Sequence, residues 1–297
     1  MMRKRLLKDK LAGKYMLLLT ILSSLIVFLM VIGLYQRSRP ILAIKSLSEL
    51  LLSTSWHPLR TEFGYFPFIM GSLWVTGVAI VIAIPLCLLT AVYLSEYAPR
   101  YVREWIKPLI DLLAGIPSVV YGVWGVLVIV PLIKNYIAPF FGTFSSGYSV
   151  LAGGIVLAIM IFPIIIHVSL EVFRSIPHEI REASLSLGAT KWQTIKHVVI
   201  RKAMPGIIAA IVLGLSRAFG ETMAVLMVTG NVAKTPTSVL DPAYPLPALI
   251  ANNYGEMLSV PLYDSALLLA CLFLLLVVLF FNIVVRVVLI RIERYTQ

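Results

Sequence analysis

The stretch EVFRSIPHEIREASLSLGATKWQTIKHVVIR, residues 171–201, is the longest polar interruption in the apolar second half of the chain. Proline suits the first turn of a helix and carboxylates suit its positive end, so a helix is predicted to begin at Pro177, where two glutamates follow. Gly188 predicts a break, after which a second short helix would cover residues 190–200. The pattern is typical of a helix–glycine–helix that fits a groove in another protein. An ordinary solvated loop is the alternative interpretation.

The composition of the chain indicates a membrane protein. Of its 297 residues, 60% are hydrophobic, which exceeds what a soluble domain of this size needs. The net charge of +11 comes from basic residues at the ends of apolar segments, so it reflects topology and predicts no binding to nucleic acid. Cys87 and Cys271 lie in separate apolar runs and the four histidines are scattered, so neither a disulfide nor a metal site is predicted.

Six apolar segments predict an all-α, polytopic membrane protein with six transmembrane helices. The first segment is too long for the core of a signal peptide and no cleavage site follows, so it is predicted to remain as an anchor. Of the 25 Lys and Arg residues, 18 fall on the side of the two termini and the 171–201 stretch, and 6 fall on the other side. This excess predicts that both termini are cytoplasmic. The six segments are residues 15–35, 68–94, 108–133, 150–170, 204–228 and 262–289.

Two charged residues, Arg217 and Glu221, stand inside the predicted fifth span. They are four residues apart and would share one helix face. At about 1.5 Å per residue, Arg217 lies roughly 18 Å beyond Pro205, near the middle of a bilayer. An unpaired guanidinium there costs at least about 2.5 kcal/mol, so the two side chains are predicted to face protein or a water-lined path. A substrate path and a structural ion pair both satisfy this requirement.

A second candidate site is AGIPSVVYG, residues 114–122, inside the predicted third span. Glycine and proline together break a helix and free backbone groups, which neighbouring chain, the Ser118 hydroxyl or a ligand must then satisfy. Broken helices within a membrane often mark a transport site, although a simple packing kink is the alternative. The chain has no phosphate-binding loop and no nucleophile–base or paired-histidine motif, so we predict no enzymatic activity.

These features together resemble the membrane subunits of type I ABC import systems. Glu182, Ala183 and Ser184, with Gly188 six positions after the glutamate and Ala189 beside it, resemble the EAA loop. In that family the EAA loop docks onto the ATPase subunit. The resemblance therefore implies that residues 171–202 couple the membrane domain to a separate ATPase, which would bind the ATP, and that this chain binds no cofactor of its own.

The motifs LAGIPSVVYGVWG (residues 113–125) and SRAFGETMAVLMVTGN (residues 216–231) are similar to those of the permease subunits of Pst-type phosphate importers. The resemblance implies a heterodimer with a second, related permease subunit, an ATPase dimer, and a phosphate-binding protein outside the membrane. It also implies that Arg217 and Glu221 lie on the phosphate path, and we predict Ser118 and Thr222 for the same path. A carboxylate at Glu221 could accept a hydrogen bond from a protonated oxygen of phosphate. It would repel sulfate, which carries no proton.

The resemblance divides the chain into a cytoplasmic N-terminus, a first transmembrane helix with an outer loop, an importer transmembrane domain and a cytoplasmic tail. These parts are residues 1–14, 15–68, 69–290 and 291–297. Two other functions remain open at this point. The permease could carry another oxyanion, such as sulfate or molybdate, or the chain could be a membrane signalling component that transports nothing. Secondary transport is disfavoured because the polar loop would then have no partner.

Overall fold

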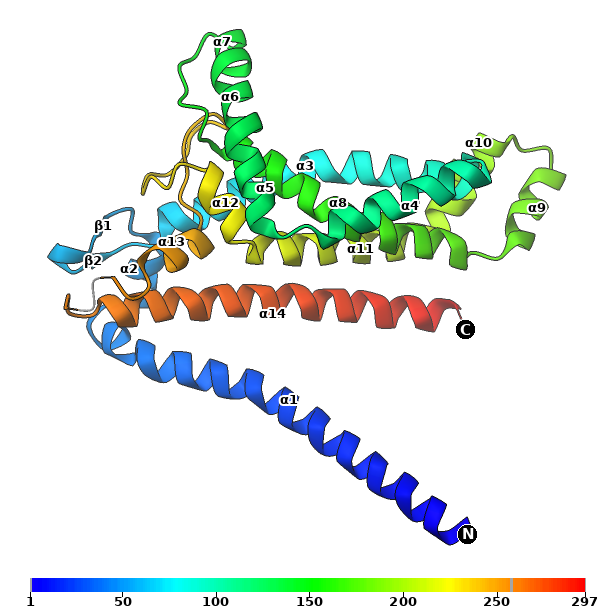
Figure 1. The fold of residues 1–297 in the computed structure, drawn as a ribbon, viewed down its shortest axis with the longest axis horizontal. Coiled ribbons are helices and arrows are strands. Elements are labelled where there is room, and N and C mark those ends of the chain that lie inside the picture. The colour runs from blue at the N-terminus through cyan, green and yellow to red at the C-terminus, as the bar shows by residue number, and fades with distance from the viewer. Residues whose placement is uncertain (1, 257–258, 297) are drawn as a thin grey trace.

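The chain forms an almost entirely helical structure in a computed structural model that describes residues 2–256 and 259–296 (Figure 1). Within these ranges the strands are limited to β1 (Trp56–His57) and β2 (Glu62–Phe63), which pair antiparallel. Six helices are long and apolar enough to cross a membrane, which agrees with the predicted all-α polytopic class. Their bounds are Leu11–Ile44, Phe66–Tyr97, Ser118–Phe140, Val150–Ser175, Lys191–Gly220 and Tyr263–Val288.

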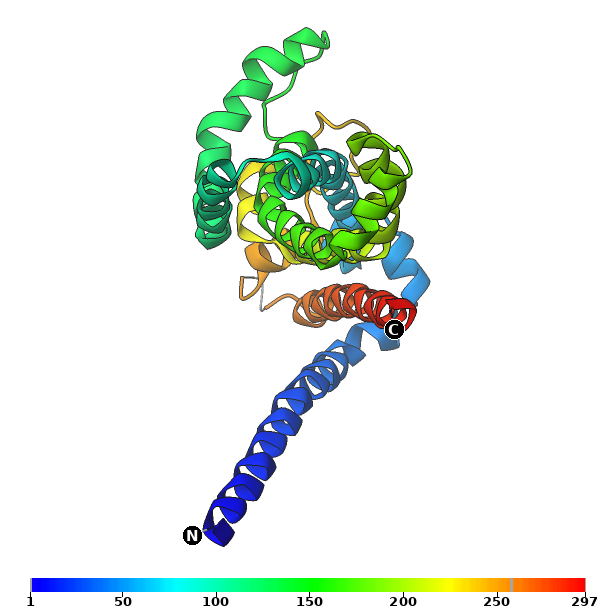
Figure 2. The ribbon, with the colours of Figure 1, turned by 90° about the vertical axis from the view of Figure 1, so that its right-hand side faces the viewer.

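The centre of the molecule is a bundle of four helices that lie side by side (Figures 1 and 2). Small residues allow the helices to approach closely: a Cβ on Gly214 would lie 2.8 Å from a side-chain carbon of Ile165. Small side chains at helix contacts are typical of membrane bundles, where van der Waals packing drives association. The helices are α3 (Phe66–Val92), α8 (Val150–Ser175), α11 (Ile200–Gly220) and α14 (Tyr263–Thr296).

The first helix, α1 (Met2–Ile44), leaves the bundle and is longer than the predicted span of residues 15–35. Its second half packs on α14 through a cluster around Ile41, whereas the large apolar side chains of residues 11–30 are exposed. The mixed segment after it contains α2 (Leu47–Leu52), the turn η1 (Pro58–Arg60) and the two short strands.

The third span is present, but its predicted bounds, residues 108–133, are wrong. The chain leaves α3 through η2 (Tyr93–Tyr97), forms the separate amphipathic helix α4 (Arg100–Gly115) and breaks at Ile116 and Pro117. The membrane-crossing helix then runs from Ser118 to Phe140, so the segment predicted as a loop after residue 133 begins as helix. Pro117 explains the break because it disfavours helical backbone in the residue before it. This helix is built from α5 (Ser118–Trp124), η3 (Gly125–Ile129), α6 (Val130–Leu132), η4 (Ile133–Ile137) and α7 (Ala138–Phe140).

The fifth predicted span, residues 204–228, is also wrong at both ends. One helix runs from Lys191 to Gly220, because α10 (Lys191–Thr194) and η5 (Ile195–Val199) continue directly into α11. The backbone is extended at Glu221, with φ −74° and ψ 128°, and a new short helix follows. The remaining helices are α9 (His178–Ser186), α12 (Met223–Val228) and α13 (Leu246–Asn253).

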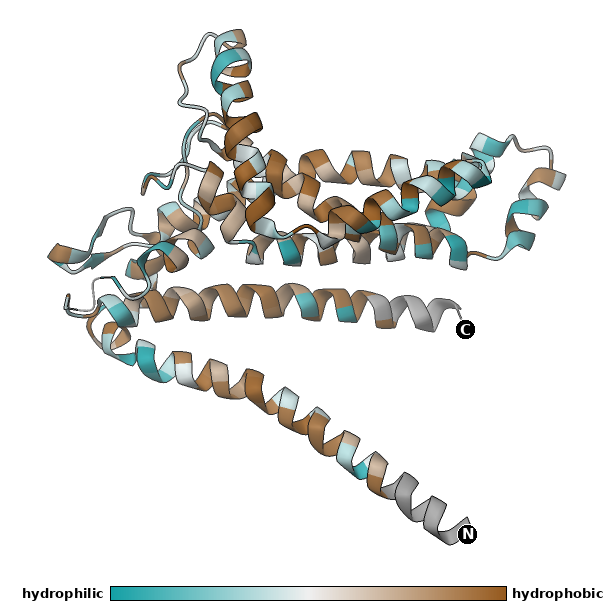
Figure 3. Ribbon diagram, in the orientation of Figure 1, coloured by the Kyte–Doolittle hydropathy of each residue, from teal (hydrophilic) through white to brown (hydrophobic). Residues whose placement is uncertain are grey.

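Both ends of the chain point the same way as the polar loop. In Figure 1, α1 begins and α14 ends toward the side of the bundle where α9 and α10 lie, which we call the α9 end. Hydropathy follows the same division: the long helices are mostly apolar, and polar residues gather in α9 and α10 (Figure 3). This arrangement fits an even number of membrane crossings.

Candidate coupling loop and transport site

The predicted helix–glycine–helix is present at the α9 end. Helix α9 starts after Pro177 and ends before Gly188, which has φ +83° and open space where a Cβ would point. Thr190 then caps the next helix through a reciprocal pair of hydrogen bonds with Gln193. The prediction that the second helix ends at residue 200 is wrong, because it continues into the bundle as α11. One continuous helix, with a π-helical turn at η5 and Pro205 inside it, therefore leads from the loop toward Arg217.

The residues predicted for ATPase coupling lie together on α9 and the turn after it. Glu182, Ala183 and Gly188 are exposed, whereas Ser184 and Ala189 are half-buried. The Ser184 hydroxyl lies 2.9 Å from the Thr194 hydroxyl and ties α9 to α10. Exposed apolar side chains at Leu185, Leu187 and Trp192 stand among them. A protruding helix with a mixed polar and apolar surface has the character of a docking element.

An ion pair that sequence reasoning missed fixes α9 to the bundle. Arg181 donates to both carboxylate oxygens of Glu96 in η2, at 2.8 and 3.2 Å, and the side chains are only 14% and 9% exposed. The same guanidinium donates to the carbonyls of Phe173 and Ile176 at the end of α8. The two residues are 85 positions apart, and neither sequence motif gave a signal that they meet.

The two helix breaks lie beside each other. A Cβ on Gly122 in α5 would contact Ala224 in α12, and a Cβ on Gly125 would contact Val228. The contacts advance in the same chain direction on both helices, which therefore run parallel, so Ser118, Glu221 and Thr222 fall at the same end of this helix pair. The break before α5 is stabilised by the Tyr121 hydroxyl, which donates to the Leu113 carbonyl at 2.8 Å.

The prediction that Arg217 and Glu221 share a helix face is wrong, because the helix ends at Gly220. Among the described residues, no salt bridge joins the two side chains. Glu221 instead accepts a hydrogen bond from the Thr222 backbone N–H at 3.2 Å, and the Thr222 hydroxyl donates to the Gly220 carbonyl. Arg217 is exposed, so its fork of donors is available to an anion.

The depth of this site follows from α8. Glu221 and Ala218 line a small cavity with Leu157, which lies seven residues from the start of α8 at Val150. At about 1.5 Å per residue the cavity is about 10 Å from that end of the helix. Glu221 and the nearby Arg217 therefore lie within the span, closer to the end opposite α9 than predicted.

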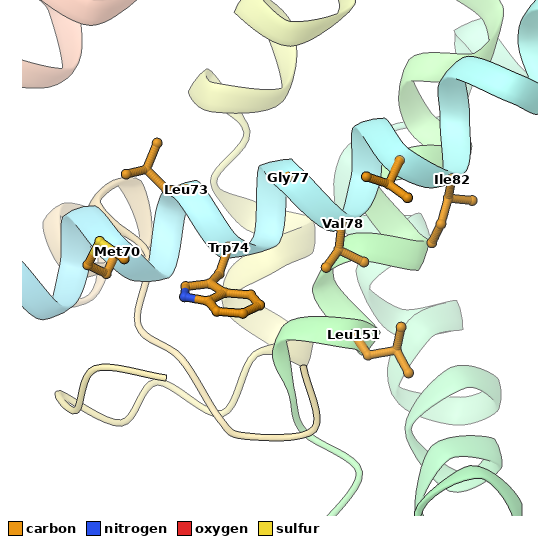
Figure 4. A pocket seen from close by; sticks show the side chains of 8 residues that line it. Met70, Leu73, Trp74, Gly77, Val78, Ile82 and Leu151 are labelled. Carbon is orange, nitrogen blue, oxygen red and sulfur yellow. The ribbon is translucent and has the colours of Figure 1, made fainter. Parts of the chain in front are cut away.

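A wide pocket elsewhere on the bundle has a different chemistry. It has a volume of about 570 Å³ and is lined by apolar side chains of α3, including Leu73, Trp74 and Val78, together with Leu151 of α8 (Figure 4). None of the predicted path residues lines it. Apolar walls cannot replace the hydration of an oxyanion, so this pocket is no candidate for the transport site.

The fold and the site together define an integral membrane subunit with a broken-helix site inside the span and a docked helical loop at one end. Residues 83–294 match the family model of the binding-protein-dependent transport system inner membrane component, and the chain belongs to this family. It is therefore a multi-pass inner-membrane subunit of an ABC importer that works with a binding protein and an ATPase, and its own role is transport rather than catalysis.

Sequence and structure comparisons with individual proteins support the same family. The chain is 39% identical over 256 residues to the phosphate transport system permease protein PstC of Xylella fastidiosa, covering 82% of this chain and 78% of the relative. It is 35% identical over 257 residues to PstC of Haemophilus influenzae, covering 82% and 80%. In structure it resembles a chain of a bacterial alginate ABC transporter, with TM-score 0.59 and 18% identity over 93% of this chain and 94% of that one. That likeness shows the fold.

Proposed function

We propose that this chain is the permease subunit of an ATP-driven importer of inorganic phosphate. The relatives named PstC support phosphate as the cargo, because they align over most of both chains. Transport of another oxyanion by the same architecture is the competing interpretation, and anion competition separates the two.

The exposure of Arg217 carries the proposal. A guanidinium inside a membrane span is too costly to face lipid, so the surface around Arg217 has to meet water or another protein. A second permease subunit on that surface would enclose a path with Arg217 on its wall. Its planar fork matches the oxygens of phosphate. Glu221, Ser118 and Thr222 lie at the neighbouring breaks and supply a carboxylate and two hydroxyls to the same path.

The partners that we propose are supported by the family to which the chain belongs. One partner is a second permease subunit that is related to this chain. A second partner is an ATPase dimer, which binds ATP and contacts α9 at Glu182, Ala183 and the turn at Gly188. A phosphate-binding protein delivers the cargo at the opposite end. No cofactor is held by this chain itself. The excess of basic residues at the α9 end supports a cytoplasmic position for both termini and the loop. Closure of the ATPase dimer would move α9 and, through it, the bundle.

The test is uptake of radiolabelled phosphate by cells that carry Arg217→Gln as their only copy of this subunit. We expect a loss of at least about tenfold at equal protein level in the membrane, because each lost charge-assisted hydrogen bond weakens phosphate binding. Lys134→Gln, which removes an exposed charge far from the breaks, is the matched control. Uptake that stays within twofold of the control in Arg217→Gln would refute the proposed path. Inhibition of wild-type uptake by sulfate as strong as by unlabelled phosphate would refute the proposed cargo.

A further inference from the structure

A second polar cavity lies between α4 and α8, near the α9 end and well away from the helix breaks. It has a volume of about 180 Å³ and contains Arg103 and Lys107 from α4 and His167, Glu171 and Arg174 from α8. On α8, His167 and Arg174 lie 10 and 17 residues beyond Leu157, which is about 15 and 25 Å from the level of Glu221. The cavity is therefore separate from the proposed transport site.

The two walls of the cavity are joined to each other at one end. His167 Nε2 lies 2.9 Å from an oxygen of Asp111, one turn beyond Lys107 on α4. At the other end Arg103 and Arg174 both line the cavity, and among the described residues neither has a salt bridge. Glu171 is the one carboxylate among the lining residues, against three cations. The cavity therefore has excess positive charge.

The most buried of these cations has an unused donor. Arg103 donates through Nη2 to the carbonyls of Ser95 and Ala98, both at 3.3 Å. Among the described residues its Nη1 makes no hydrogen bond, and its Nε is enclosed by protein without a partner. An unsatisfied buried donor is costly, and a charged one more so. Glu96, adjacent to Ser95, pairs with Arg181, and among the described residues it forms no salt bridge with Arg103.

The residues around the cavity favour the binding of an anion in it. Leu94, Ile110 and Leu170 are buried and form an apolar floor, which lowers the local dielectric and makes each charge–charge contact stronger. On the outer face of α4, Tyr101 and Trp105 are 67% and 76% exposed. Exposed aromatic side chains near the end of a span are typical of the membrane–water interface, where phosphate groups are abundant.

We propose that this cavity binds a phosphate group, held by Arg103, Lys107 and Arg174. Arginine is suited to this because its fork can contact two oxygens at once, and the volume admits the group with room for water. The group can belong to inorganic phosphate or to the headgroup of an anionic phospholipid, because both present the same charged oxygens. The site does not depend on which anion the chain transports, and a variant at Arg217 leaves it intact.

The experiment uses the purified full chain in a nonionic, phosphate-free detergent. One arm measures binding of radiolabelled inorganic phosphate by equilibrium dialysis, and the other measures retention of phosphatidylglycerol against phosphatidylcholine by native mass spectrometry. We compare wild type, Arg103→Gln/Arg174→Gln, and a control, Arg60→Gln/Lys134→Gln, which removes two exposed charges elsewhere. Wild-type binding is expected in at least one arm, at least tenfold weaker in the cavity variant and unchanged in the control.

The outcomes separate the two sources. A loss confined to inorganic phosphate identifies the free ion as occupant, and a loss confined to phosphatidylglycerol identifies the lipid. Equal binding of both probes by the cavity variant and the control overturns the proposal, as does absence of binding by the wild type in both arms. If the double variant elutes as aggregate, Lys107→Gln replaces it, because Lys107 is exposed; an effect below twofold in both arms then overturns the proposal. Arg217→Gln, which impairs uptake if the proposed function holds, is expected to retain this binding.

Discussion

Arg181→Gln is expected to release α9 from the bundle. The substitution removes both bonds to Glu96 and the bonds to the carbonyls of Phe173 and Ile176. Among the described residues, the mostly buried carboxylate of Glu96 then keeps the Ser95 hydroxyl as its one side-chain donor. An exposed pair would tolerate this loss, but the two side chains here are 14% and 9% exposed. A buried charge without a partner is the costly outcome.

The magnitude follows from the burial. Removing one partner of a buried ion pair costs about 3–5 kcal/mol, and the small remaining exposure of this pair favours the lower end. At about 1.4 kcal/mol for each factor of ten, a cost of about 3 kcal/mol raises the population of undocked α9 on the order of 100-fold. Glu96→Gln is expected to have a smaller effect, because Arg181 keeps its bonds to the two α8 carbonyls.

Hydrogen exchange measures this population directly. Amides of residues 178–186 exchange through local opening, so their rates are expected to rise on the order of 100-fold in Arg181→Gln while the core of α8 is unaffected. The matched control is Arg100→Gln, which breaks an exposed pair with Glu104 at 2.8 Å. Such i,i+4 pairs contribute about 0.3–0.5 kcal/mol, so the loss of this pair is expected to change amide exchange rates no more than roughly twofold. Rates in Arg181→Gln that remain within twofold of those in Arg100→Gln would refute the docking role of the pair.

Three further outcomes are expected. Glu221→Gln should reduce the preference for phosphate over sulfate in competition uptake, and an unchanged preference would eliminate Glu221 as the selective group. Backbone and side-chain bonds from Thr237, with help from Ser238, lower the pKa of Asp241, so its contribution to loop order is present above the ordinary value of roughly 3.9 and disappears as pH falls through the lowered pKa. Hydrogen exchange of residues 237–238 should show protection that persists below that ordinary value in the wild type but not in Asp241→Asn. Gly122→Val should lower Tm, since its side chain would meet α12 and overpacking costs about 1–3 kcal/mol, whereas Gly77→Val has open space and should change Tm far less.

Local patterns in the sequence were sufficient for the loop at the α9 end. Pro177, Gly188 and Thr190 each act on the backbone within a few residues, and the helix start, the break and the second start all lie where they predict. The break at Pro117 was predicted for the same reason. The sequence did not reveal that α4 is a separate helix before this break. The apolar residues of α4 merge with the next segment when hydropathy is averaged along the chain.

The break at Glu221 could not be predicted in this way. Residues 223–228 are apolar and include no proline, so they read as a continuation of the helix, whereas the backbone is extended at Glu221 and α12 packs against α5. The pair between Arg181 and Glu96 was hidden for a related reason. Two charges 85 residues apart give no periodic signal, and their meeting depends on the whole path of the chain through α3 and α8.

The contacts form one continuous route from the loop to the proposed path. Arg181 joins α9 to η2, η2 leads into α4, α4 ends at the break before α5, and α5 packs on α12 beside Glu221. A second route runs from Thr190 through the unbroken helix to Arg217. Because both routes start in the segment from Arg181 to Thr190, we expect a movement of α9 to reach both breaks. Two discrete breaks would then let a small displacement of α9 change the geometry around the proposed anion path.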